Sequence, residues 1–344
     1  MTKTKLSPMI KKIKNTTFAD ALLTIFIFAT MAIIISNPKQ FSTGTISGLK
    51  LFFYSVLPGL FPFMLLSKLI TEIGFLFKIT PRFDKFSKAV FGTSGVSLYA
   101  FFMSILSGYP IGAKIIADLY QKQLITDEEA KKMSIFCTTS GPIFIIGTVG
   151  TMMFQSFKIG VIIYFAHILS SIIMGICYNL LTKKHSKPTT KNTHQQLCFQ
   201  NIKSENVLSI CINQTINSLF IVGAYITIFY LLAELLESFN FITITTNLLS
   251  YILSPLNIDK NCIKGFLHGI LEVTRGAKEL SLSHSSLSVA LCCGIVSFSG
   301  ISIICQMLAF LKTAKIKAHN FVLSKCVHMI LSIFICLLIV IILN

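Results

Sequence analysis

The chain has 344 residues, of which 53% are apolar and only 12% are charged, and its formal net charge is +17. About a quarter of the residues of a soluble domain are charged, so this composition excludes an ordinary soluble enzyme and indicates an all-α polytopic membrane protein. The positive charge is typical of cytoplasmic loops rich in Lys and Arg. We therefore expect a lipid bilayer around the chain and no nucleic acid as a partner.

Residues 1–50 are predicted to hold a cytoplasmic lysine-rich segment and a first transmembrane helix. Residues 18–36 form an apolar run, and Asn37-Pro38 ends it. A signal peptide is an alternative, but no cleavage site with small residues follows the run. We expect the helix to stay attached, with its N-terminus in the cytoplasm.

Residues 51–181 form the first of two expected repeats. Residues 51–70 read as a span that Pro58 and Pro62 should kink. Residues 77–91 mix basic and aromatic side chains, which is typical of a short helix on the membrane surface.

The next apolar segment, residues 96–121, is interrupted by Gly108-Tyr109-Pro110. Each half of about a dozen residues would reach roughly 18 Å, well short of the ~30 Å hydrocarbon core. Spans are expected after it at 133–154 and 160–181.

A polar linker at 182–205 precedes the second repeat, residues 206–344. Spans are expected there at 218–236, 289–310 and 321–343, and a short or amphipathic helix at 245–256. The segment 262–282 corresponds to the interrupted segment of the first repeat. Both segments contain Gly-Ala-Lys, and Gly112 and Gly276 are 164 residues apart. The same offset places Gly59 on Gly223, which suggests duplication.

The distribution of basic residues tests whether the interrupted segments span the membrane or return to the side from which they entered. If both return, the cytoplasmic segments are 1–16, 73–95, 119–132, 182–205 and 312–320, which carry most of the lysines. The outer segments keep only Lys39, Lys50, Lys158 and Lys260. The positive-inside rule therefore favours two re-entrant helical hairpins in an inverted repeat of transmembrane helices, which is a transporter architecture.

Several motifs carry a resemblance to a known family. Residues 57–63 (Leu-Pro-Gly-Leu-Phe-Pro-Phe), 107–114 (Ser-Gly-Tyr-Pro-Ile-Gly-Ala-Lys) and 139–142 (Thr-Ser-Gly-Pro) resemble the YlbJ/SpoVV sporulation integral membrane protein family. The run Glu272-Val273-Thr274, with Gly276, is similar to nucleoside recognition (Gate) domains. The resemblance implies a fold like that of concentrative nucleoside transporters. It also implies transport of dipicolinate, from the mother cell towards the forespore, at the mother-cell or outer forespore membrane.

The chemistry of the two interruptions suits an anionic solute. A half-helix that begins near Ile111 would point free backbone N–H groups at a cavity, and the guanidinium of Arg275 suits a carboxylate pair. Glu272 is a candidate for binding a coupling cation or proton, or for pairing with Arg275. We expect no resident cofactor or metal. The candidate substrate-binding residues are Gly108, Tyr109, Pro110, Gly112, Lys114, Thr138, Thr139, Ser140, Gly141, Glu272, Thr274, Arg275, Gly276, Ser297, Ser299 and Gly300.

Each candidate also has a structural interpretation. Glu272 and Arg275 are three residues apart and could simply pair across one helical turn. Lys114 could extend to the membrane interface, and the Ser/Thr-Gly-Pro run could only allow close helix packing. Thr126 followed by three acidic residues is typical of a helix N-cap, not of a catalytic carboxylate pair.

Three classes of function stay open. The first is a secondary transporter of a small anion, and the second is a nucleoside transporter of the same fold, against which the lack of Asn and Gln at both tips argues. The third is a non-transporting scaffold in spore assembly. A membrane enzyme is disfavoured because no hydrolase or phosphate-binding motif is present. Oligomeric state, including a homo-oligomer, is left open.

Overall fold

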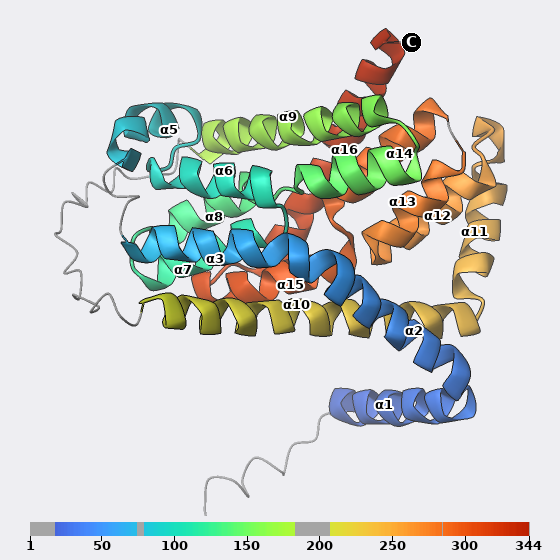
Figure 1. Cartoon of the computed structure of the whole chain (residues 1–344). Helices are drawn as coiled ribbons and strands as arrows, with labels where there is room; N and C mark the ends of the chain where they lie inside the picture. Colours follow the sequence, from blue (N-terminus) through green and yellow to red (C-terminus); the bar gives the residue numbers. More distant parts are fainter. Residues whose placement is uncertain (1–17, 74–78, 183–206, 284, 344) are drawn as a thin grey trace, which may run out of the picture.

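The computed structural model describes residues 18–73, 79–182, 207–283 and 285–343, and all regular elements within these ranges are helical (Figure 1). The lysine-rich segment 1–16 and nearly all of the linker 182–205 lie outside the described residues. Four described helical stretches are long and apolar enough to cross a bilayer, and helices α1 and α2 make a fifth if that bent pair counts as one span. The protein is an all-α membrane protein.

The N-terminal part is more helical than expected. Helix α1 (Phe18–Ser36) is followed by α2 (Pro38–Leu51), a π-helical turn (η2, Phe52–Val56) and α3 (Leu57–Ile73). α1 and α2 meet at an angle of 102°, since Pro38 begins a new helix at a favoured first position. The expected outer segment 37–50 is therefore a helix, and it packs along α10.

The first interrupted segment is a pair of helices, α6 (Val96–Ser107) and α7 (Ile111–Gln121). A short 3₁₀ turn (η3, Thr80–Phe83) and α5 (Asp84–Val90) precede them. The interruption is a complete break, because Gly108 has φ 81° and residues 108–110 belong to neither helix. The prediction of a break at these three residues is confirmed.

The expected continuous span at 133–154 is wrong. Helix α8 (Asp127–Phe136) stops before the Thr-Thr-Ser-Gly-Pro run, and a π-helix (η4, Ile143–Met153) begins after it. Pro142 has no N–H to continue α8, and Gly141 lies against another backbone, as described below. The expected span at 160–181 is α9 (Phe157–Thr182). The N-cap prediction at Thr126 is confirmed by a capping box with Glu129.

The second half contains α10 (Val207–Ser238), α11 (Phe241–Ile252), α12 (Lys260–Leu271) and α13 (Val273–Ser281). It continues with α14 (Ser286–Phe298), α15 (Gly300–Leu311) and α16 (Ala318–Leu343), and short 3₁₀ turns follow α11 (η6, Ser254–Leu256) and α15 (η7, Lys312–Ala314). The expected span at 289–310 is thus bent where Ser299 and Gly300 both have positive φ.

The helices of the two halves follow the same order. α6 and α12 each have 12 residues, and α9 and α16 each have 26. In Figure 1, α6, α7 and α8 lie towards one end of the long helices α9 and α10, whereas α12 and α13 lie towards the other end. The breaks between these short helices therefore fall in the interior of the molecule, where two apolar clusters surround them.

Candidate functional site at the helix breaks

Glycines allow the two breaks of the first half to touch. A Cβ atom on Gly108 would lie 2.5 Å from the backbone nitrogen of Gly141, and one on Gly112 would lie 1.7 Å from the carbonyl oxygen of Cys137. Real Cβ atoms do not approach that closely, so only glycine fits. Ser104 adds a polar link, because its Oγ accepts the N–H of Thr139 at 3.0 Å. The break between α6 and α7 is thereby fixed against the break between α8 and η4.

The second half repeats this contact. A Cβ atom on Gly300 would lie 3.2 Å from both the carbonyl oxygen of Gly269 and the nitrogen of Val273. Within the helix pair α12–α13, a Cβ on Gly276 would lie 2.2 Å from the Cα of Gly269. The break at Glu272 thus lies against the bend between α14 and α15.

Tyr109 and His167 connect the two sets of breaks. The hydroxyl of Tyr109 donates a hydrogen bond to the carbonyl of Val296 in α14. His167 in α9 accepts the N–H of Ser140 at Nε2 (2.9 Å), and its Nδ1 lies 2.7 Å from the Oγ of Ser297. Because Nε2 is an acceptor, the proton of a neutral ring is on Nδ1 and is donated to Ser297. One imidazole therefore joins the break of the first half to α14 of the second.

Lys325 and His328 of α16 complete this buried centre. Lys325 is 1% exposed, its ammonium donates to the carbonyl of Thr138 at 2.5 Å, and it lies 5.3 Å from the ring centroid of Tyr109. His328 stacks on His167 with 4.9 Å between ring centroids, and its Nε2 lies 3.2 Å from the carbonyl oxygen of His167. The other nitrogen of His328, Nδ1, is buried and has no hydrogen-bond partner.

The sequence analysis missed His167, Lys325 and His328. A signal existed, because ionisable residues within an apolar membrane segment are functional candidates by default, and Lys325 and His328 lie within the apolar run at 321–343. The Gly- and Pro-rich motifs indicate only the breaks, so the predicted candidates lie at or near the breaks. What no sequence pattern indicated is that α9 and α16 carry these side chains to the same place.

Glu272 and Arg275 do different things at the start of α13. The carboxylate of Glu272 accepts the backbone N–H groups of Thr274 (3.0 Å) and Arg275 (2.8 Å), which caps the helix. The guanidinium of Arg275 pairs instead with Glu237 at 2.8 Å and Glu234 at 3.8 Å, both on α10. The hypothesis that these two residues pair with each other across one turn is therefore wrong.

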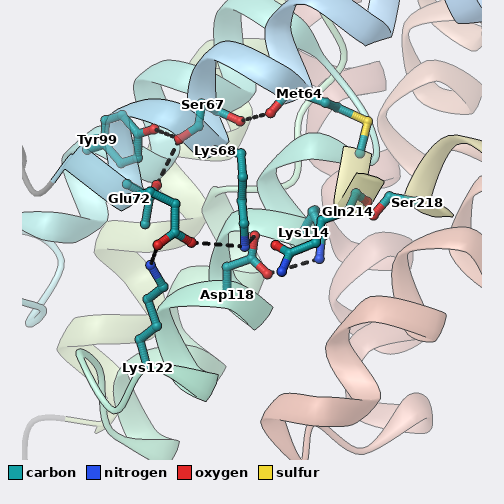
Figure 2. Close-up of polar contacts among 11 residues, drawn as sticks. Met64, Ser67, Lys68, Glu72, Tyr99, Lys114, Asp118, Lys122, Gln214 and Ser218 are labelled. Carbon is teal, nitrogen blue, oxygen red and sulfur yellow. Dashed lines mark hydrogen bonds and ion pairs between the residues drawn. The ribbon is translucent and has the colours of Figure 1, made fainter. Parts of the chain in front are cut away.

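Lys114 lies in a cluster of five charged side chains that joins α7 to α3 (Figure 2). Asp118 is 2.9 Å from Lys114 and 3.1 Å from Lys68, while Glu72 is 3.6 Å from Lys68 and 2.8 Å from Lys122. With three lysines and two carboxylates, the cluster carries one excess positive charge. A narrow recess beside it is lined by Met64, Ser67, Lys68, Ile111, Lys114, Asp118, Gln214, Thr215 and Ser218.

Fourteen of the sixteen candidates fall into three groups. The centre bridged by His167 contains Tyr109, Thr138, Ser140 and Ser297, and the contacts of the first-half breaks add Gly108, Pro110, Gly112, Thr139 and Gly141. The second-half contact contains Glu272, Thr274, Gly276, Ser299 and Gly300, and the hydroxyl of Ser299 is buried without a partner. Lys114 and Arg275 do not join these groups, because their charged ends are paired on α7 and α10.

Comparison with known proteins gives one informative relationship. No family model and no solved structure matches the chain. Among curated proteins, the sporulation integral membrane protein YlbJ of Bacillus subtilis (strain 168) is 25% identical in an alignment of 320 positions that covers 88% of this chain and 78% of the relative. This similarity over most of the chain supports the resemblance to the YlbJ family of sporulation integral membrane proteins.

Proposed function

We propose that this protein is a secondary transporter that moves a small anion, with dipicolinate as the first candidate, across the mother-cell or outer forespore membrane during sporulation. Its two halves would form an inverted repeat, in which α6–α7 and α12–α13 are re-entrant hairpins that enter from opposite sides. One observation carries the proposal. In each half, the break of the helix pair lies against the break of the following helix, at Gly108 and Gly141 and at Gly300 and Val273.

That arrangement is what solute binding near the middle of a membrane requires. Backbone that leaves the helix at this depth is tolerated only where protein buries it or where it lines a cavity. Transporters of several folds place substrates at such breaks, because half-helix ends supply free N–H and C=O groups. A scaffold protein has no need of two broken helices in each half, so the broken helices favour a transporter over a scaffold.

The preference for an anion rests on α7 and its surroundings. No side chain caps the N-terminus of α7, whereas Glu272 caps the equivalent end of α13. The first turn of α7 contributes Ile111 and Lys114 to the recess beside the charged cluster, where Lys68 adds a second ammonium group. Uncapped N–H groups and two lysines against one aspartate favour a carboxylate or a similar anion.

The sporulation role of the relative supports dipicolinate as the first anion to test. Dipicolinate has two carboxylates on a flat aromatic ring, which suit paired ammonium groups and backbone N–H donors. Uptake of labelled dipicolinate and of uridine into vesicles that contain the full-length protein separates an anion carrier from a nucleoside carrier. We expect uptake of dipicolinate and none of uridine.

Two variants connect that uptake to the recess. Lys114→Gln should reduce dipicolinate uptake at least about tenfold, which corresponds to the loss of one charge-assisted contact. Lys88→Gln is the matched control, because Lys88 lies on α5 with 66% of its side chain exposed and should leave uptake unchanged. Uptake of uridine without uptake of dipicolinate would show that the solute is a nucleoside and not an anion. Normal dipicolinate content in spores that lack the protein would contradict the transport proposal.

A further inference from the structure

The position of Lys325 at the end of a broken helix is unusual for a lysine. Helix α8 ends at Phe136, and Cys137 and Thr138 continue past its C-terminus towards the break. The ammonium of Lys325 donates to the carbonyl of Thr138 there. Helix C-termini carry partial negative charge from unpaired carbonyl groups, so this place attracts a cation.

The charge of Lys325 has no acidic partner in the described part of the chain. The ion pairs there all lie elsewhere, in the α3–α7 cluster, in the α10–α13 pairs and at exposed positions on α5 and α12. Instead of a carboxylate, Lys325 has the carbonyl of Thr138 and the faces of the Tyr109 and Phe321 rings, at 5.3 and 5.9 Å. An ammonium held only by a carbonyl and ring faces is solvated in the way that a small inorganic cation is solvated.

The titratable groups around Lys325 leave it as the sole charge of the centre. The neighbours are His167 from α9, His328 from α16 itself, Tyr109 from the α6–α7 break, and Cys293 from α14 near the tyrosine. Nε2 of His167 accepts an N–H, which requires a neutral ring. Nε2 of His328 lies against a carbonyl and must donate to it, so Nδ1 carries a free lone pair. The structure therefore supplies an open proton acceptor one helical turn from Lys325.

We propose that the ammonium of Lys325 occupies the coupling-cation position of this centre, so that the transport cycle uses a proton on Lys325 in place of a sodium ion. Unwound carbonyls and half-helix C-termini are the groups that hold Na⁺ or H⁺ in secondary transporters. Loss of the proton would leave a neutral amine, remove the attraction to the C-terminal end of α8 and release that end from α16. This inference rests on the proposed transport function.

The test uses full-length protein in vesicles with the membrane potential held at zero, and labelled dipicolinate as the solute. With a gradient of one pH unit, acid outside, vesicles should accumulate a solute that enters together with one proton. The solute concentration inside should exceed that outside by up to about tenfold. A sodium gradient at equal pH should produce no accumulation. Lys325→Met keeps the apolar stem and should lose accumulation driven by the pH gradient. Lys88→Met removes one exposed charge and should behave like the unchanged protein.

A second readout does not depend on transport or on folding of the variant. The melting temperature of the unchanged protein in detergent should be the same in sodium and in choline at equal ionic strength. A filled sodium site would raise it by roughly 5 °C. Such a rise, or accumulation driven by sodium, would overturn the Lys325 inference and leave the transport proposal intact. If neither gradient drives accumulation and no counterflow of dipicolinate is seen, the transport proposal itself is rejected.

Discussion

At the scale of single residues, glycine at a few positions decides where the helices break. Gly108 has φ 81°, a left-handed value that residues with a Cβ avoid, and it lies against the backbone of Gly141. Gly108 and Pro110 stand out in an apolar run, so the sequence predicted this break correctly. The break at Cys137–Pro142 was missed, because the surrounding run had the length of a normal span and only the contact with Gly108 explains the interruption.

Alanine at Gly108 should destabilise the protein by about 2–4 kcal/mol, because the new Cβ adds both left-handed strain and a clash with Gly141. The free energy of unfolding in mixed micelles titrated with SDS measures the effect. Gly59→Ala is the control, since no atom lies within 4 Å of its added Cβ and alanine favours the helix by up to about 1 kcal/mol. Equal stability of the two variants would show that the breaks do not touch in the membrane.

The meeting of Lys325, His167 and His328 could not be predicted from the sequence. Each is a single polar residue in an apolar helix, and the sequence does not say which helices face one another. Their meeting depends on α9 and α16 packing side by side, which only the three-dimensional structure specifies. The tautomers of the two histidines follow from backbone groups far away in the sequence.

At the scale of elements, ion pairs connect the second helix of each short helix pair, α7 or α13, to another helix of the bundle. Asp118 and Lys122 connect α7 to α3, and Arg275 connects α13 to α10. The two connections use different residues, a lysine and aspartate cluster in one and an arginine with two glutamates in the other. The sequence identified Lys114 and Arg275 as candidates, but it gave no indication of Lys68, Glu72 or Glu237 as partners.

Asp118→Asn should cost about 3 kcal/mol of unfolding free energy, because it leaves three lysines with one carboxylate in a cluster whose Asp118 side chain is only 9% exposed. The matched control is Glu279→Gln, which breaks the more exposed pair with Lys264 and should cost no more than about 1 kcal/mol. A similar loss in both variants would mean that water screens the α3–α7 cluster.

Exchange of the charges of Arg275 and Glu237 tests the other connection. Arg275→Glu alone brings three acidic groups together and should lower the melting temperature by several degrees, as expected for a loss of about 2 kcal/mol or more. Arg275→Glu combined with Glu237→Arg restores opposite charges and should recover at least half of that loss. No recovery in the double variant would indicate that the pair does not hold α13 to α10.

At the scale of the whole molecule, the account depends on two helix pairs that enter from opposite sides. The all-α membrane class, the positions of most helices and the break at Gly108–Pro110 could be predicted from apolar runs, Gly and Pro. The break within 262–282 followed from the likeness of that segment to the first one. The bend between α14 and α15 could not be predicted, because Ser299 turns the chain within a run that looks continuous in the sequence. The helix α2 could not be predicted either, because Asn37 turns the chain directly after the first apolar run. The proposed inverted orientation rests on lysine counts and on the placement of α6–α7 and α12–α13 at different ends of the long helices (Figure 1).

Cysteine labelling from outside intact cells tests this orientation most directly. Lys88→Cys and Gln123→Cys flank α6–α7, while Lys260→Cys and Leu282→Cys flank α12–α13, and all four positions are exposed in the structure. With the unsubstituted chain as background for native cysteines, we predict that an impermeant reagent labels positions 260 and 282 and leaves 88 and 123 unlabelled until the cells are opened. Labelling of only one position of either pair would mean that the helix pair crosses the membrane, and the account would be contradicted.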